Sequence, residues 1–336
     1  MKYAYFTLAG LVLLFFNGCG DEGGSVYPTE FTELDSLVRV MESDLRPLEE
    51  EIKELASQTE YLFDHQDRYA KMAAREEYKI SDLGVIYRET TDKSESSVHV
   101  SSISRDRDDV FHQIYFTEAL DSAFRTIYAD SPLVAQVYFN TRLQMCRIFP
   151  SLDALHVFDT DIDLTTFNFY YMADEVRNPE KKSKWVEDIY VDPAGRGWIL
   201  SLIHPVYHLG ELEGVVGFDI TINDIIQRFL KYKDKKLLII DGSGNIVAGT
   251  NDAIEVLNLP PLRNHTYVQT INSDNFRKED YNLFKSKSKA VRKMVAKFLL
   301  EKDNVYKMGD SYSDQEYTIY CRQMNLLNWY VLEVKN

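Results

Sequence analysis

The sequence predicts an α+β protein in which a long N-terminal helix precedes two modules, each an antiparallel sheet flanked by helices. Three observations support this fold class. Apolar residues recur at helical spacing over residues 34–62, amphipathic helices and strand pairs with tight turns follow, and this mixture occurs twice along the chain. The length of 336 residues suits about two domains, and a hydrophobic fraction of 45% can fill their cores.

The start of the chain predicts a bacterial lipoprotein. One lysine is followed by an apolar run that is short for a membrane span and suits a secretory signal. The FNGC sequence that ends it resembles the lipobox, whose cysteine, here Cys19, receives lipid, although Phe16 and Asn17 depart from the usual residues. We therefore expect a signal peptide over 1–18 and an acidic, glycine-rich tether over 19–30. A cleaved signal with an incidental cysteine and an uncleaved anchor are the alternatives.

A long helical stalk is expected over residues 31–66. Its apolar positions are spaced by three and four, apart from one polar break, and are Leu34, Leu37, Met41, Leu45, Leu48, Ile52, Leu55 and Leu62. Pro47 is expected to bend this helix or divide it in two. The apolar seam suits either a homodimer or packing on the body of the same chain, and the sequence leaves both open.

The larger, membrane-distal module is expected over residues 67–232. A helix at 67–78, a serine-rich loop or edge strand at 93–109 and an amphipathic helix at 110–130 come first. Four strands are then predicted at 133–140, 146–150, 198–207 and 213–221. A short helix over residues 222–233 ends the module.

The smaller, membrane-proximal module is expected over residues 233–336. It begins with KLLIIDGSGNIVAGT, a strand, turn and strand that form a strong hairpin signal. A lysine-rich helix at 281–302 follows. Three more strands are predicted at 304–309, 316–324 and 328–334.

Composition and motifs narrow the function. The net charge of −15 argues against sequence-independent binding to nucleic acid, which depends on Lys and Arg. The chain lacks zinc-type spacing of Cys and His and lacks hydrolase, P-loop and dinucleotide-binding patterns, so we expect no metal, no cofactor and no catalytic residues. Cys146 and Cys321 fall in different predicted modules, so a disulfide between them is not expected.

Several short motifs, in their order and spacing, are similar to those of a known family. VYFNTRLQMCRIFP, FYYMADEV, WVEDIYVD, HPVY and GVVGFDI resemble the double Cache domain, a tandem PAS-like (PDC) extracellular sensor domain, most clearly over residues 133–230. The resemblance implies two PAS-like modules and binding of a small molecule for signal transduction, without enzymatic activity. It places the ligand pocket in the membrane-distal module.

The resemblance also implies site residues. In amino-acid-binding members the aspartate of the GxxGxD strand, here Asp219, contacts the ligand ammonium group. Asp192 and Tyr190 of the YxD motif belong to the same pocket, as do the aromatic residues at Phe169 and Tyr170. The complete expected ligand-binding set is Tyr138, Arg147, Phe169, Tyr170, Trp185, Tyr190, Asp192, His204 and Asp219.

One departure from the family pattern affects the expected ligand. Phe167 stands where an arginine would hold a ligand carboxylate, so Arg142 or Arg147 would have to replace it. Carboxylates and aromatic rings together suit an ammonium group or a protonated heterocycle. We therefore expect an amine-bearing or cationic ligand.

Other interpretations of these residues stay open. Asp219 could accept hydrogen bonds in a purely structural role, or His204 and Asp219 could form an acid–base pair of an enzyme. The chain could also be a structural or interaction lipoprotein that binds no ligand and uses its stalk for docking. A lipid-anchored sensor in the cell envelope, at the periplasmic face or the outer surface, would signal through an unidentified membrane signalling or transport partner.

Overall fold

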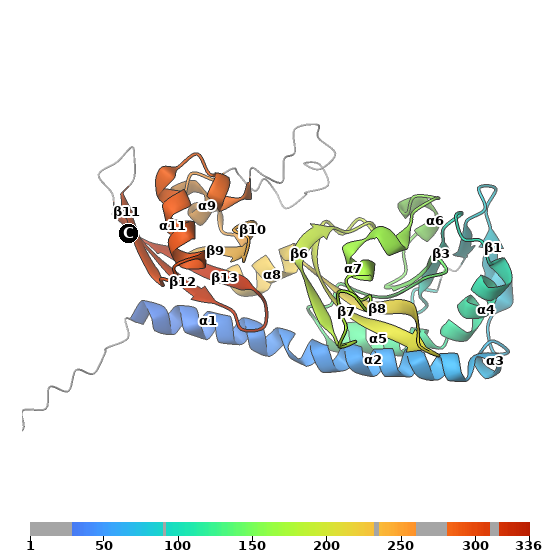
Figure 1. The fold of residues 1–336 in the computed structure, drawn as a ribbon. Helices are drawn as coiled ribbons and strands as arrows, with labels where there is room; N and C mark the ends of the chain where they lie inside the picture. The colour runs from blue at the N-terminus through green and yellow to red at the C-terminus, as the bar shows by residue number, and fades with distance from the viewer. Residues whose placement is uncertain (1–28, 90–91, 232–234, 260–280, 310–315) are drawn as a thin grey trace, which may run out of the picture.

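The computed structural model describes residues 29–89, 92–231, 235–259, 281–309 and 316–336 (Figure 1). The predicted signal peptide and the lipid attachment site at Cys19 lie outside the described residues.

The predicted stalk is one nearly continuous rod. It consists of α1 (Thr29–Leu45) and α2 (Pro47–Asp64) and runs beneath both modules (Figure 1). Arg46 keeps helical backbone angles between them, with φ −59° and ψ −39°. Pro47 takes the first position of α2, where its missing N–H costs little, so it divides the helix without breaking the rod.

The apolar seam of the stalk is buried in its own chain. All eight predicted positions are less than 9% exposed, and they join the side chains of both sheets in one core. The structure therefore selects packing on the body of the same chain. A homodimer through residues 31–66 stays a prediction, and it would have to use the exposed side of these helices, because the seam has no free apolar surface left.

The first sheet has eight strands in the order β1-β2-β3-β5-β4-β8-β7-β6. The strands are β1 (Tyr78–Ile80), β2 (Ile86–Arg88), β3 (Ser97–Val100), β4 (Gln136–Thr141), β5 (Met145–Phe149), β6 (Lys184–Val191), β7 (Trp198–His208) and β8 (Glu211–Thr221). The helices around it are α3 (Gln66–Tyr69), α4 (Arg107–Thr117), α5 (Leu120–Asp130), α6 (Ala154–Val157), α7 (Asn168–Tyr171) and α8 (Ile222–Ile225). A π-helical turn at Ile226–Leu230 continues α8.

The second sheet has five strands in the order β10-β9-β13-β12-β11. They are β9 (Lys236–Asp241), β10 (Ile246–Gly249), β11 (Val305–Gly309), β12 (Glu316–Gln323) and β13 (Trp329–Lys335), accompanied by α9 (Asn251–Val256) and α11 (Lys289–Leu299). If β9 is counted as the first strand of this module, the order across the sheet is second, first, fifth, fourth and third strand. In the first sheet, the strands β5-β4-β8-β7-β6 have the same order when β4 is counted as the first strand. This confirms two modules of one topology on a helical stalk.

Some predicted elements differ from the structure. The helix expected at 67–78 is reduced to α3 and a 3₁₀ turn, and the helix expected at 110–130 is two helices. The serine-rich segment contains β3, an inner strand whose four residues are all buried. Its polar composition disguised it, because Ser97 satisfies its hydroxyl by donating to the Leu152 carbonyl at 2.7 Å. The lysine-rich helix is shorter than expected, since Ser288 caps its start.

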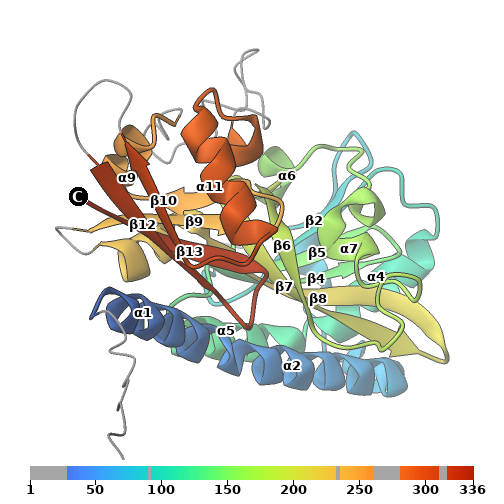
Figure 2. The same ribbon diagram turned by 60° about the vertical axis from the view of Figure 1, so that its left-hand side comes forward.

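The two faces of the first sheet have different partners. Side chains at alternate strand positions pack against α2, α4 and α5 on one face and around α6 and α7 on the other (Figures 1 and 2). A one-residue step along a strand therefore moves a side chain from one face to the other. This parity decides which predicted site residues meet.

Candidate functional site

Asp219 lies in the centre of the first sheet, between two hydrogen-bond donors. Gln136 of β4 and Ser201 of β7 are its direct register partners on either side. The Gln136 amide donates to Oδ2 of Asp219 at 2.6 Å and the Ser201 hydroxyl donates to Oδ1 at 2.5 Å. The carboxyl group is only 2% exposed. Both oxygens are thus held in place, and each retains room for a further partner.

Gln136 joins Asp219 to a second carboxyl group. Its amide nitrogen also donates to Asp192 at 3.1 Å, while its amide oxygen accepts from the Arg196 guanidinium at 2.8 Å. Asp192 in turn accepts from the backbone N–H groups of Ala194 and Arg196, at 2.8 and 3.2 Å. The turn after β6 is therefore built around Asp192, which holds that carboxylate beside Asp219.

Burial controls the charge of this pair. It raises the pKa of Asp219 from 3.8 to about 8, and the nearby Asp192 carboxylate acts in the same direction. Burial also raises the pKa of Asp192, against the lowering effect of its two backbone donors. At neutral pH and without a ligand, the pair of Asp192 and Asp219 therefore carries less than two negative charges.

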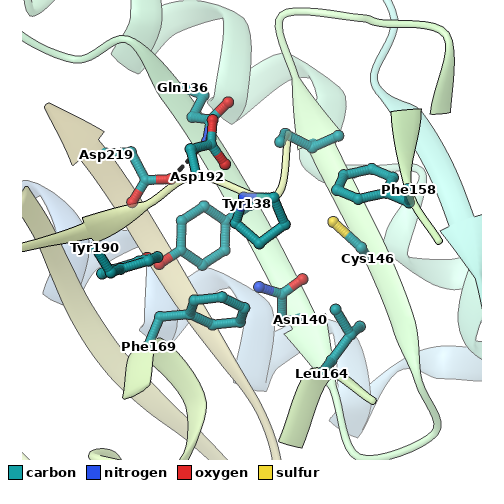
Figure 3. A pocket seen from close by; sticks show the side chains of 12 residues that line it. Gln136, Tyr138, Asn140, Cys146, Phe158, Leu164, Phe169, Tyr190, Asp192 and Asp219 are labelled. Carbon is teal, nitrogen blue, oxygen red and sulfur yellow. Dashed lines mark hydrogen bonds between the residues drawn. The ribbon is translucent and has the colours of Figure 1, made fainter. Parts of the chain in front are cut away.

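A small cavity adjoins the two carboxyl groups. Its volume is about 20 Å³, which is room for a single water molecule. The lining residues are Gln136, Tyr138, Asn140, Cys146, Ile148, Phe158, Leu164, Phe169, Tyr190, Asp192, Pro193 and Asp219. Figure 3 shows the acidic groups gathered at one end and mostly apolar groups at the other, with the Tyr138 ring between them.

Two polar atoms of the lining have no hydrogen-bond partner among the described residues. They are the hydroxyl of Tyr138 and the side-chain oxygen of Asn140, on residues that are 3% and 4% exposed. A buried polar atom without a partner costs about 1 to 3 kcal/mol. By contrast, the Tyr190 hydroxyl is paired with Ser201 at 2.7 Å. The unpaired atoms mark where a polar group of a ligand, or a water molecule, would be stabilised.

The structure brings together five of the nine predicted ligand-binding residues. Those that line the cavity are Tyr138, Phe169, Tyr190, Asp192 and Asp219. Tyr170 packs in the same cluster of buried side chains without lining the cavity.

Three predicted residues lie on the opposite face of the sheet and cannot line this cavity. Arg147 donates to the Ile114 carbonyl, Thr117 and Ser96, all on the helical side. The three residues are Arg147, Trp185 and His204, and each is next in its strand to a residue on the cavity side of the sheet. Since consecutive residues of a strand face opposite sides, this one-residue step explains the error.

Trp185 and His204 face the stalk. The indole N–H of Trp185 donates to Glu49 of α2 at 3.0 Å, and the His204 ring is paired with Ser183 at 2.9 Å. Burial lowers the pKa of His204 to about 4. Since His204 and Asp219 lie on opposite faces, the acid–base pair considered from the sequence is not formed.

Arg142 does not replace the missing carboxylate anchor either. Its guanidinium forms an ion pair with Glu213 at 2.9 Å, at the turn between β4 and β5. Arg142 is not among the residues that line the cavity.

Sequence reasoning missed Gln136, Asn140, Cys146, Ser201 and Arg196. The first two share the strand parity of Tyr138, which was a usable signal. Ser201 was hidden, because only the register of β7 against β8 places it opposite Asp219. Cys146 and Cys321 are both buried and free, in different modules, as expected.

Gly217 is the residue on which the Tyr138 ring rests. A Cβ atom at this position would lie 2.0 Å from Cζ and 2.2 Å from the hydroxyl oxygen of Tyr138. Gly217→Ala should therefore displace the ring and cost about 1 to 3 kcal/mol of unfolding free energy, measured by denaturant titration. Gly309→Ala is the matched control, because nothing lies within 4 Å of its Cβ position. Equal stability of the two variants would contradict this packing.

Within the described ranges, no group of three or more His, Cys, Asp or Glu side chains could hold a metal ion. No helix in the same ranges has the length and hydropathy needed to cross a membrane.

Comparison with known proteins gives structural likeness at low identity. No protein-family model and no curated protein sequence matches this chain. The structure is similar to the sensory domain of the Campylobacter jejuni chemoreceptor Tlp3 (CcmL), with 11% identity, a TM-score of 0.47 and coverage of 93% of this chain and 95% of that one. It is also similar to the ligand-binding domain of the Pseudomonas aeruginosa amino acid chemoreceptor PctB in complex with L-Gln, with 12% identity, a TM-score of 0.43 and coverage of 85% and 88%. At these values the likeness says nothing about the ligand of this chain.

Proposed function

We propose that this chain, whose two modules on a stalk have the architecture of a double Cache sensor domain, binds an amine-bearing small molecule in the cavity beside Asp219. The observation that carries the proposal is the acidic end of this cavity. Two buried carboxyl groups, Asp192 and Asp219, are held side by side by one shared amide donor. Two adjacent buried acids are costly even with the Arg196 guanidinium nearby, and a bound ammonium group lowers that cost.

The rest of the lining defines the other end of the ligand. Phe158, Leu164 and Phe169 provide apolar and aromatic surface away from the carboxyl groups (Figure 3). Between the two ends, the unpaired hydroxyl of Tyr138 offers a hydrogen-bond donor and the unpaired side-chain oxygen of Asn140 offers an acceptor. The site suits a molecule with a cationic amine at one end, an apolar or aromatic body, and a neutral polar group between them.

Binding requires the site to open. A cavity of about 20 Å³ is far smaller than any amine with such a body. Its polar floor comes from strands and, for Asp192, from the turn after β6, whereas Phe158, Leu164 and Phe169 lie in or beside short helical segments between strands. We propose that this covering layer moves outward to admit the ligand, while the strand residues stay in place.

The closed cavity also favours a second candidate function. Each oxygen of Asp219 already accepts a hydrogen bond, from Gln136 or Ser201, so a fold without a ligand could retain this residue for structure alone. The chain would then be a structural or interaction protein. This candidate and the sensor differ in whether any small molecule stabilises the fold.

The remaining parts of the proposal concern location and signalling. We propose that Cys19 carries the lipid that anchors the protein in a bacterial cell envelope, and that ligand occupancy is passed to a membrane signalling or transport partner. We propose a binding function and no catalysis, because the thiol nearest the carboxyl groups, Cys146, is buried and its pKa is raised by that burial.

A thermal-shift screen tests the proposed function. The panel holds amines, amino acids, organic acids, nucleobases and divalent cations, and each compound is tested on the wild type and on Asp219→Ala. A ligand present at 100 times its Kd should add about 2.7 kcal/mol of stability. We expect at least one amine to stabilise the wild type and to have no effect on Asp219→Ala.

The opposite pattern would favour the structural candidate. In that case no compound shifts the wild type, while Asp219→Ala melts early without any ligand. Arg142→Ala is a useful control, because this residue does not line the cavity and its removal should leave any amine response intact.

A further inference from the structure

The second module contains a groove that the proposed amine site does not use. It lies between the end of α9, the start of α11 and the edge strand β11, on the face of the second sheet away from α1 (Figures 1 and 2). Its volume is about 710 Å³, within the range of pockets that hold small organic ligands.

Three lysines at the start of α11 surround this groove. Lys287 precedes α11, and Lys289 and Lys293 lie one turn apart on it. All three are exposed, and no acidic residue is among the described residues that line the groove. Lys307 of β11 also borders the groove, but it alternates with the buried Met308 along the strand, so its side chain is on the other face of the sheet. Three like charges gathered with no counter-ion among the described residues attract an anion.

This concentration of positive charge is unusual for the chain. The whole protein has a net charge of −15, yet residues 235–336 carry 15 Lys and Arg against 12 Asp and Glu. Elsewhere in the same module, lysines are paired: Lys297 contacts Glu301 and Asp303 at 2.5 and 3.2 Å. The lysines of the groove therefore have no acidic partner in the part of the chain that the structure describes, although the whole chain has a surplus of acidic residues.

The floor of the groove is apolar. Leu257 and Met308 are buried there, at 1% and 8% exposure, and the half-buried ring of Tyr306 lies beside them. A cationic rim over an apolar floor is complementary to a molecule with both a charged and an apolar part. A small inorganic anion would leave the floor uncovered.

We propose that this groove is a second ligand site, which binds an organic phosphate: a phosphate group held by the lysine rim, with an apolar or aromatic body on the floor. Lysine ammonium groups bind phosphate as point charges and do not require a fixed geometry. The phosphate could belong to a free small molecule or to the headgroup of an anionic lipid, and both present the same chemistry to the lysines.

Binding experiments on the full chain test this site. Adenosine 5′-monophosphate is titrated by calorimetry as the free organic phosphate, and phosphatidylglycerol vesicles are compared with phosphatidylcholine vesicles by co-sedimentation. The test variant is Lys287→Gln/Lys289→Gln/Lys293→Gln. The control variant Lys71→Gln/Lys79→Gln/Lys93→Gln removes the same charge from exposed lysines of the first module.

We expect one of the two probes to bind the wild type, to bind more weakly at high salt, and to lose roughly tenfold or more of its affinity in the test variant only. The probe that binds identifies the source of the phosphate. If neither binds, or if the test variant binds as tightly as the wild type, the proposal is wrong and the lysines only keep this surface soluble. Asp219→Asn should bind the same probe normally, so this outcome is separable from that of the amine site.

Discussion

Asp219→Asn should strongly weaken amine binding while leaving the empty protein more stable at alkaline pH. The amide keeps the size of the carboxyl group and can still meet Gln136 and Ser201, but it cannot become negatively charged to hold an ammonium group. Loss of one buried, charge-assisted contact is expected to weaken binding about 100-fold or more, since such contacts contribute 2 to 5 kcal/mol. Calorimetric titration of the wild type and the variant with the same amine measures this loss.

The stability of the empty protein should change in the opposite direction. The pKa of Asp219 is raised from 3.8 to about 8 in the fold, so the folded state holds a proton that the unfolded chain releases. The wild type therefore loses stability as the pH rises from about 4 to about 8, and the loss is complete above that range. Asp219→Asn lacks this loss and should be a few kcal/mol more stable at pH 8, by denaturant titration. A variant less stable than the wild type at every pH would indicate a structural role for the ionised carboxylate.

Removal of Arg147 should have the largest effect on folding. Arg147 is 0% exposed and lies between β5 and the helices α4 and α5, where it donates to Ile114, Thr117 and Ser96 and forms an ion pair with Asp121 at 3.4 Å. Arg147→Met would remove the one guanidinium that these buried groups share, although Asp121 keeps Arg88 at 2.7 Å and the Ile114 carbonyl keeps the Thr117 hydroxyl at 3.3 Å. Breaking a buried pair of this kind costs about 3 to 5 kcal/mol, which corresponds to a drop in Tm of about 6 to 20 °C.

The same variant separates folding from ligand binding. Because Arg147 is on the face opposite the cavity, Arg147→Met that is still folded at low temperature should bind the amine with unchanged affinity. Arg147→Lys keeps a charge but fewer donors, so its stability should lie between the two. A fully stable Arg147→Met that no longer binds the amine would restore the original prediction that Arg147 contacts the ligand.

The sequence was sufficient to predict the architecture and the acidic end of the cavity. Hydrophobic spacing revealed the stalk, and tight-turn residues revealed the strand pairs on which Tyr138 and Asp219 lie. The resemblance to double Cache domains placed Asp192, Tyr190 and Phe169 in one pocket with Asp219, and these residues do line one cavity.

The errors have a common physical origin in strand parity and register. Arg147 lies between Cys146 and Ile148, both of which face the cavity, so a one-residue step separates a cavity residue from a buried structural arginine. Strand parity with Tyr138 could have indicated Gln136, but only the register of β4 and β7 against β8 places Gln136 and Ser201 opposite Asp219. Pairing between strands distant in sequence is set by tertiary packing, and no local pattern encodes it.

The proton balance of amine binding tests the central claim most directly. In the empty site Asp219 is protonated at neutral pH, and a bound ammonium group requires it to ionise. Calorimetry with the best amine of the screen, in two pH 7 buffers of different ionisation enthalpy, should show release of about one proton by the wild type and no binding by Asp219→Asn. Equal binding to both proteins without proton release would contradict the assignment of Asp219 as the ligand contact.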